Sequence, residues 1–320
     1  MKEKISNALS IIIPLLLGLG LMWYSYNSFT EKQLEEMKGY FVSADYNYVF
    51  FSLIFALLGY VLRAYRWKYT LTQIGYKPNF KLNFLAVSIG YFVNLSIPRS
   101  GEVSRALILK KYQNVPFGKA FGTIIAERIV DFIILLLFIF VSLIIEFETL
   151  KGFLLFYIPI DKIVMLLVIG SIVFMVGVYF YFYSNHKLIL GIKLKISGLK
   201  EGALSIYKMP YKWQFLGSTL LIWFSYVLMF FVTTLALKVS CHLSFGTALV
   251  AFVIGSLTIA FTNGGFGFFP ILIAKILFLY HIPLEAGNAF GWIVWTSQLI
   301  ITVFLGLMSF LLLPIITRKK

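Results

Sequence analysis

Long apolar stretches separated by short polar gaps constrain this sequence more than any other feature. A helix needs about 20 predominantly apolar residues to cross the hydrocarbon core of a bilayer. Six stretches have this character: residues 8–26, 46–62, 119–145, 163–183, 213–237 and 287–313. The chain is 60% hydrophobic and only 13% charged, so a soluble fold could not cover its apolar surface. The sequence predicts an all-α polytopic membrane protein with one transmembrane domain, residues 1–320.

Two further apolar segments are short or broken. Residues 84–97 stop at Pro98, and residues 245–280 are interrupted by the run Asn263-Gly264-Gly265-Phe266-Gly267. The first stretch, residues 8–26, could be a signal peptide, but it is long for one and no small-x-small cleavage site follows it. It is interpreted as the first transmembrane helix.

The distribution of Lys and Arg predicts the topology. Alternate gaps, at residues 1–7, 63–83, 99–119, 184–212 and 314–320, hold 21 of the 28 basic residues, whereas residues 27–45, 146–162 and 238–244 hold 5. Basic loops lie on the cytoplasmic side, so both termini are expected there, in the cell (inner) membrane. The two broken segments must then enter and return, which gives six spanning helices plus two re-entrant broken-helix hairpins. Eight full spans with one basic loop outside is the alternative.

Charge and composition narrow the function classes. The net charge of +15 lies in gaps between apolar segments, so it indicates anionic lipid headgroups rather than nucleic acid as the partner. Cys241 stands alone, and His186, His242 and His281 show no metal-ligand spacing. No cofactor or metal is expected. The basic segment 184–212 fits either an amphipathic surface helix or an ordinary basic loop.

The two broken segments resemble each other. When Gly90 is aligned with Gly255, Pro98 falls on Asn263 and Ser100 on Gly265, at a constant offset of 165. The repeats would span about residues 46–146 and 213–313 and begin on opposite sides of the membrane, which predicts an inverted repeat. Matching helix breaks in two halves of a membrane protein indicate a transporter's binding site, because broken backbone survives in hydrocarbon only where protein or water covers it.

Three charged residues lie inside the long helix 119–145. To span the bilayer, this helix must draw Glu127, Arg128 and Asp131 into the membrane's inner third. Charges there are expensive and need partners, unless they snorkel to the interface. The run Arg63, Tyr65, Arg66 and Trp67 is interpreted as interfacial, at the end of the second span.

The first break supplies candidate partners in Arg99, Glu102 and Arg105. Pro98 ends one half-helix and Ser100 can cap the next, whose positive N-terminal end, beside Arg99 and Gly101, suits a phosphate. The sequence therefore predicts a pocket with arginines for phosphate and acids for a cationic headgroup. In the second half, Lys275, Asn288 and Gln298 are further polar candidates. Snorkelling of the long Lys275 side chain to the interface is the alternative for that residue.

These motifs resemble a known family. Asn94, Pro98, Arg99, Gly101, Glu102 and Arg105, then Glu127, Arg128 and Asp131, then a Gly-Gly-x-Gly break at Gly264, Gly265 and Gly267, are similar to the lysylphosphatidylglycerol synthase transmembrane region, a flippase-like family. The resemblance covers about residues 10–313. The third motif departs from the family pattern, because Asn263 replaces the usual proline and Pro270 stands near the place of an acid.

The resemblance implies translocation of a polar-headed phospholipid, such as an aminoacylated one, between leaflets. It adds Asn94 to the headgroup residues. The soluble aminoacyl-transfer domain of the founding members is not expected here, because the chain ends at Lys320. A membrane-embedded lipid-modifying transferase and a non-transporting regulatory protein remain as alternatives. The sequence does not indicate an oligomeric state.

Overall fold

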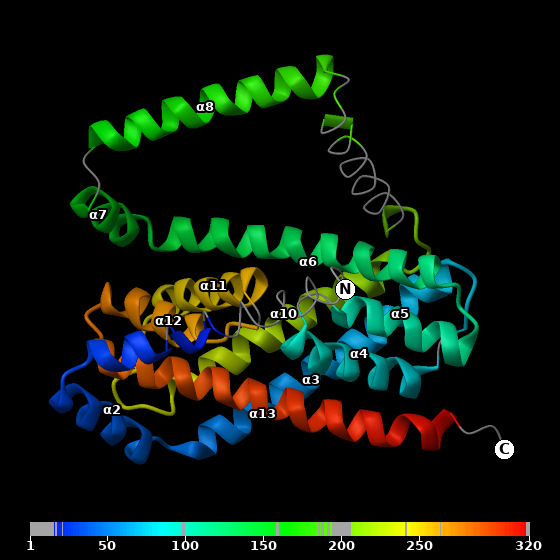
Figure 1. Ribbon diagram of the computed structural model, residues 1–320, viewed down its shortest axis with the longest axis horizontal. Helices are drawn as coiled ribbons and strands as arrows, with labels where there is room; N and C mark the ends of the chain where they lie inside the picture. The colour runs from blue at the N-terminus through cyan, green and yellow to red at the C-terminus, as the bar shows by residue number, and fades with distance from the viewer. Residues whose placement is uncertain are drawn as a thin grey trace.

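The computed structural model describes the chain apart from residues 1–15, 17, 21, 78, 98, 99, 158, 159, 185, 187, 188, 191, 192, 194–205, 241, 263 and 318–320. Every described element is a helix (Figure 1). In chain order these are α2 (Glu31–Ser43), α3 (Tyr46–Gln73), α4 (Phe80–Ser96), α5 (Ser100–Gln113), α6 (Phe117–Ile145), α7 (Phe147–Tyr157), α8 (Ile160–Tyr183), α10 (Lys212–Thr234), α11 (Phe245–Phe261), α12 (Phe268–Phe278) and α13 (Leu284–Thr317). Residues 22–28, before α2, are also helical.

Four of the described helices are long and apolar enough to cross a membrane: α3, α6, α10 and α13. They contain 23 to 34 residues each, or about 34 to 51 Å at 1.5 Å per residue. Shorter apolar helices accompany them, namely α4, α11, α12 and residues 168–183 of α8. The prediction of an all-helical fold is confirmed for the described residues, and four of their helices have the length and composition of membrane spans.

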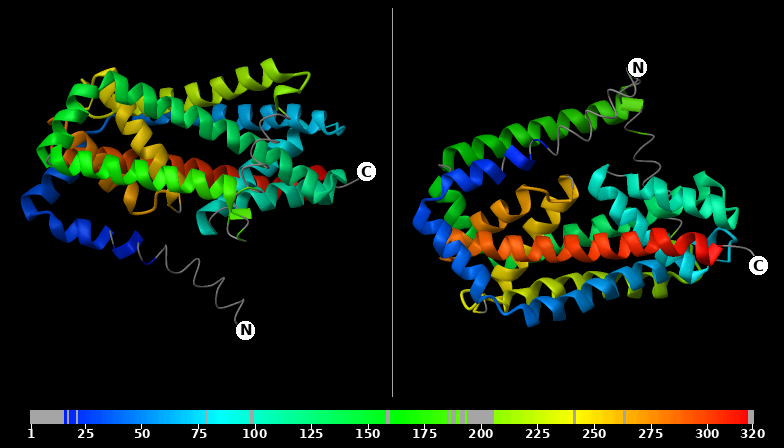
Figure 2. Two further views of the ribbon diagram at one scale, coloured as in Figure 1. Left: turned by 90° about the horizontal axis from the view of Figure 1, so that it is seen from above. Right: turned by 60° about the horizontal axis from the view of Figure 1, so that its bottom comes forward.

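The bundle forms by helices pairing along the long axis of the molecule (Figures 1 and 2). Helices α3 and α10 pack together over most of their length, α13 packs on α4 and α12, and α6 packs on α5 and α11. One apolar core lies among α10 to α13, around Phe230, Phe252 and Phe290, and a second lies among α3 to α5, around Trp67. In Figure 1, α8 lies apart from this bundle, and its described side chains are mostly exposed.

Helices α4 and α5 form the first hairpin. The side chain of Asn79 caps α4 by accepting from the Lys81 N–H at 3.0 Å, and Asn94 Oδ1 accepts from the Gly101 N–H at 2.7 Å at the start of α5. Ser100 is the first residue of α5 rather than the predicted N-cap, and its hydroxyl donates to the Ile97 carbonyl at 2.5 Å. Asn94 performs that role because its amide oxygen reaches an orphan N–H of the new helix. The predicted break at Pro98, with Arg99, lies outside the described residues.

Close backbone contact holds this hairpin together at two glycines. A Cβ atom on Gly101 would overlap the Gly90 carbonyl oxygen and the Asn94 amide. A Cβ atom on Gly90 would lie 2.9 Å from Arg105 Cγ. The absence of side chains at both positions therefore allows α4 and α5 to approach and sets the position of Arg105.

Replacing Gly101 by alanine is expected to lower the free energy of unfolding by about 1–3 kcal/mol, because the added methyl overpacks the hairpin. Thermal unfolding in detergent measures the change. Gly122→Ala on α6 is the matched control, since nothing lies within 4 Å of the added Cβ there. Equal melting temperatures for the two variants would contradict the close approach.

Helices α11 and α12 form the second hairpin. Its turn contains Gly264, Gly265 and Gly267 with φ of 63°, 82° and 75°, conformations that favour glycine. Thr262 Oγ1 accepts from the Gly265 N–H at 3.0 Å, and the Trp295 indole donates to the Gly264 carbonyl at 2.8 Å. The run of glycines thus forms a tight, hydrogen-bonded turn. Asn263 lies outside the described residues.

The two hairpins approach each other from opposite ends of the bundle (Figure 2, right). Their turns meet inside it, because a Cβ atom on Gly264 would lie 3.6 Å from Leu95 Cδ2 at the end of α4. At about 16 to 26 Å, each of the four hairpin helices, of 11 to 17 residues, is shorter than the hydrocarbon core of about 30 Å.

Some elements differ from the sequence expectations. Residues 27–45 contain helix α2, which begins at a capping box of Thr30 and Gln33 and is joined to α13 by a hydrogen bond from Gln33 to Glu285. Helix α7 follows α6. Most of the basic segment 184–212, and most of the first predicted span, lie outside the described residues.

Candidate functional site: a buried cluster of ion pairs

Helix α3 contributes two buried arginines to the interior of the bundle. The sequence placed the run Arg63, Tyr65, Arg66 and Trp67 at the membrane interface. Only Tyr65 is exposed, whereas the other three side chains point into the bundle with exposed fractions of 5%, 0% and 0%. The second span does not end at Leu62 but continues as one helix to Gln73. The long helix carries the arginines inward because acidic groups on α6 compensate their charge.

Asp131 on α6 accepts from both of these arginines. Its Oδ2 lies 2.9 Å from Arg63 Nη1 and 3.1 Å from Arg66 Nη2, while Oδ1 lies 2.6 Å from Arg66 Nη1. Arg66 therefore binds the carboxylate through two parallel hydrogen bonds, the strongest geometry for this pair. Arg66 also donates to Thr219 of α10 at 3.1 Å, so the group joins three helices.

Glu127 lies one helical turn before Asp131 and binds the arginine of the first hairpin. Glu127 Oε2 is 3.1 Å from Arg105 Nη2 and 3.8 Å from Arg66 Nη2. The Arg105 guanidinium stacks on the Trp67 ring, 4.1 Å from its centroid, a favourable cation–π distance. The Trp67 indole in turn donates to Thr123 at 2.9 Å. Arg105 is thus held in place by the Glu127 carboxylate, by the Trp67 ring and by the packing of the first hairpin.

Arg128 and Glu102 form the accessible edge of the cluster. Arg128 Nε lies 3.3 Å from Glu102 Oε1, and Arg128 Nη1 lies 3.7 Å from Asp131 Oδ2. The exposed fraction of the side chain is 35% for Arg128 and 17% for Glu102. For the other five charged side chains it is at most 9%. A ligand can therefore reach this ion pair more readily than the others.

Tyrosines surround the Arg63 side chain. Arg63 donates from Nε to the Tyr226 hydroxyl at 2.5 Å, and its guanidinium lies 5.4 Å and 5.7 Å from the ring centroids of Tyr226 and Tyr91. The Tyr60 hydroxyl pairs with Thr302 of α13 at 2.8 Å. Residues from α3, α4, α10 and α13 thus enclose the cluster on this side.

The charges of the cluster do not cancel. Arg63, Arg66, Arg105 and Arg128 oppose Glu102, Glu127 and Asp131, which leaves one net positive charge. Among the described residues, the buried atoms Arg105 Nε, Arg66 Nε, Glu102 Oε2 and Glu127 Oε1 have no hydrogen-bond partner. The cluster therefore retains donors and acceptors and favours an additional anionic group.

The structure brings five of the predicted headgroup residues together: Glu102, Arg105, Glu127, Arg128 and Asp131. Asn94 lies at the hairpin turn instead and holds Gly101. Arg99 lies outside the described residues. Sequence reasoning missed Arg63 and Arg66. Their spacing of three residues places them on one helix face. Because the two acids of α6 outnumber its one nearby arginine, they need further cations, and this need could have pointed to Arg63 and Arg66.

The second-half candidates are not part of this cluster. Lys275 is exposed in the last turn of α12. Gln298 is half-buried, and its carbonyl accepts from Thr302 at 2.7 Å. Asn288 is buried and lines a separate cavity beside the second hairpin.

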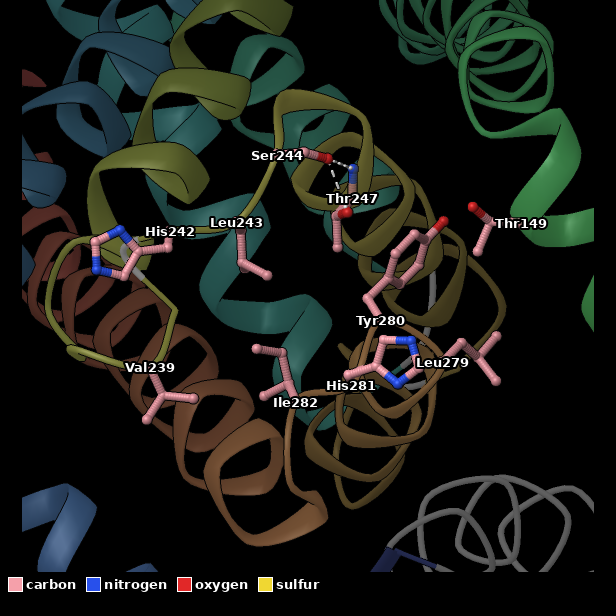
Figure 3. A pocket seen from close by; sticks show the side chains of 10 residues that line it. All are labelled: Thr149, Val239, His242, Leu243, Ser244, Thr247, Leu279, Tyr280, His281 and Ile282. Atoms are coloured by element: carbon pink, nitrogen blue, oxygen red, sulfur yellow. Dashed lines mark hydrogen bonds between the residues drawn. The ribbon is translucent and has the colours of Figure 1, made fainter.

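A further cavity of about 310 Å³ lies beside the start of α11 and the loop that joins α12 to α13 (Figure 3). His242, Ser244, Thr247, Tyr280 and His281 contribute to its lining. Burial and the Glu146 carboxylate raise the pKa of Tyr280 above its usual value. None of the cluster's charged side chains lines this cavity. In the part of the chain that the structure describes, no group of His, Cys, Asp and Glu could hold a metal ion.

A bundle of long apolar helices, two short-helix hairpins and a buried ion cluster define a polytopic membrane protein with a polar interior. The sequence matches the lysylphosphatidylglycerol synthase transmembrane region family over residues 11–314, and the protein belongs to that family. The resemblance drawn from the sequence motifs is confirmed.

Two relatives are similar over part of the chain. The UPF0104 membrane protein MJ1595 of Methanocaldococcus jannaschii is 34% identical over 142 residues, which cover 43% of this chain and 40% of that protein. The UPF0104 membrane protein PH1989 of Pyrococcus horikoshii is 26% identical over 165 residues, covering 50% and 47%. The chain therefore matches less than half the length of each relative. No solved structure matches the protein.

Proposed function

We propose that the protein is a lipid flippase that moves a polar-headed phospholipid between the leaflets of the cell membrane, rather than an enzyme. The observation that carries this proposal is the buried, net positive ion cluster with a single accessible pair, Arg128 and Glu102. A charge in the membrane is costly, and ionisable residues there mark substrate pathways. The cluster offers a phosphate the guanidinium of Arg128 and offers a cationic headgroup the carboxylate of Glu102.

The roles of the charges differ according to their exposure. Arg128 and Glu102 would separate to bind the headgroup. Arg128 would exchange the Glu102 carboxylate for a lipid phosphate, and Glu102 would exchange the Arg128 guanidinium for a cationic lipid group. The sealed charges on α3, α5 and α6 would hold this pair in place, since they already satisfy one another. An aminoacylated phospholipid, which has a phosphate and an amine, fits both members of the accessible pair.

The hairpins support this function as re-entrant elements of an inverted repeat. The offset of 165 places both ends of α4 on both ends of α11, because Phe80–Ser96 becomes Phe245–Phe261. A Cβ atom on Gly255 would meet Phe269 and Ile273 of α12, as a Cβ atom on Gly90 would meet Gly101 and Arg105 of α5. In this arrangement six helices span the membrane, both termini are cytoplasmic, and the hairpin turns meet at its interior.

The alternatives need other features. A lipid-modifying transferase requires an acid–base or nucleophile set in hydrogen-bond reach of its substrate, and Glu127 and Asp131 are instead held by arginines. A regulatory protein without transport would use the ion pairs only to join helices. The accessibility of Arg128 and Glu102 favours a ligand-binding role over that one.

Replacing Arg128 by glutamine tests the proposal. Reconstituted in vesicles, the native protein is expected to move acyl-labelled fluorescent phosphatidylglycerol between leaflets, as measured by quenching of the outer leaflet with dithionite. Arg128→Gln is expected to slow this movement at least tenfold, or about 1.4 kcal/mol, with little change in melting temperature because Arg128 is only partly buried.

Lys32→Gln is the matched control, since Lys32 is an exposed cation with only a surface ion pair to Glu36, and such pairs contribute little. Equal translocation by Arg128→Gln and the native protein would exclude Arg128 from the pathway. Absence of translocation by the native protein with phosphatidylglycerol and with its lysyl ester would reject the flippase proposal for these lipids.

A further inference from the structure

An apolar cavity of about 330 Å³ lies beside the second hairpin. Trp23, Phe29 and Met37 line one side, and Ile271, Trp292 and Asn288 line the other. Its volume falls in the range of sites that bind small molecules, about 300–1,000 Å³. The aromatic and aliphatic lining suits a hydrocarbon ligand, and membrane lipid is the abundant source of hydrocarbon around this protein.

The cavity corresponds to the ion cluster of the first half. Its lining residues Gly267, Asn288 and Trp292 lie 165 positions after Glu102, Thr123 and Glu127, respectively. The acids of the first half are therefore replaced by a glycine and a tryptophan. Equivalent places in the two halves thus have opposite chemistry, charged in one and apolar in the other.

Asn288 is the polar exception in this lining. Its exposed fraction is 3%, and its side chain lines the cavity. A side-chain amide that lines a cavity can donate a hydrogen bond to a ligand. A ligand that combines an apolar chain with a hydrogen-bond acceptor, as the ester junction of a phospholipid does, therefore matches both the apolar lining and Asn288.

We propose that this cavity binds an acyl chain of a diacyl glycerophospholipid, with the Asn288 amide donating to the ester carbonyl. The chain contacts Trp23, Ile271 and Trp292. This site does not depend on transport, because a protein that only senses lipid would bind the chain in the same way. Failure of the flippase proposal would therefore leave this site intact.

Photolabelling tests the site. The protein is reconstituted in lipid nanodiscs with phosphatidylglycerol that carries a diazirine on one acyl chain, and labelled peptides are mapped after illumination. Labelling is expected on α12 and the first turns of α13. Ile271→Trp fills the cavity and is expected to reduce that labelling about tenfold, a change of about 1.4 kcal/mol.

Leu272→Trp is the matched control, because the neighbouring side chain is exposed and does not line the cavity. It is expected to change the labelling less than about twofold, or 0.4 kcal/mol. Equal labelling of the two variants, or native labelling spread over lipid-facing residues of α8 and α13 only, would overturn the proposal.

Asn288→Leu separates the polar contact from the cavity and does not rely on the folding of the tryptophan variant. With the ester-linked probe, labelling is expected to fall about fivefold to tenfold, as for one lost hydrogen bond. With an ether-linked probe, which lacks the carbonyl, native protein and variant are expected to label equally. An equal loss with both probes would overturn the assignment of Asn288 to the ester.

Discussion

Asp131→Asn is expected to lower the free energy of unfolding by about 3–5 kcal/mol, the range measured when one partner of a buried ion pair is removed. The carboxylate accepts from Arg63 and Arg66 together, and both guanidinium groups are buried. Asparagine has nearly the same shape but no charge, so two buried cations would lose the anion that lies nearest to them. Unfolding of the purified protein, followed by heat or denaturant in detergent, measures the effect.

Asp45→Asn is the control for this substitution. Asp45 is exposed and caps α3 by accepting from the Asn47 N–H at 3.0 Å. Asparagine caps helices as well as aspartate does, so the melting temperature is expected to stay within a few degrees. If Asp131→Asn were as stable as this control, the buried arginines would have another source of compensation, and the cluster would not hold the helices together.

The membrane class could be predicted from the sequence because apolar length is a local property. Each spanning helix needs only a run of apolar residues, and α6, α10 and α13 follow such runs closely. Helices α2 and α7 were missed because they are short and partly polar. Capping by Thr30 and the contact of Gln33 with Glu285 stabilise α2, and the second of these joins residues 252 positions apart.

The end of α3 could not be predicted for a different reason. Arg63 and Arg66 after an apolar run are typical of a membrane interface, and only the position of Asp131 shows that they remain inside. A sequence shows that a buried charge needs a partner, but it does not show which distant residue supplies it. For Arg105 the partner was closer, because the hairpin and the start of α6 are neighbours in the chain.

The cluster also shows why the residue types alone could not separate binding from support. Arg105 and Arg128 are both arginines near acids, and the sequence assigned both to one headgroup pocket. Their exposures differ widely, at 4% and 35% of the side chain. The first is packed on Trp67, whereas the second faces the accessible edge. Burial therefore divides the predicted site into an accessible pair and a buried group, which the proposed function assigns to binding and to support.

A double replacement of Arg105 and Glu127 by methionine tests this division. Each single replacement leaves a buried charge without its main partner and is expected to destabilise the protein by about 3–5 kcal/mol. The double variant removes both charges, and Asp131 still binds Arg66. Because an apolar pair of similar volume can replace a buried ion pair at little cost, the double variant is expected to unfold within about 1–2 kcal/mol of the native protein.

The same double variant is expected to keep at least half of the native lipid translocation, whereas Arg128→Gln loses it while remaining folded. Recovery of stability with recovery of translocation would place Arg105 and Glu127 in support of the site. A stable double variant without translocation would mean that these buried charges contact the headgroup themselves. In that case the cluster would have to open during transport, and Arg128 and Glu102 would be its outer gate rather than its binding pair.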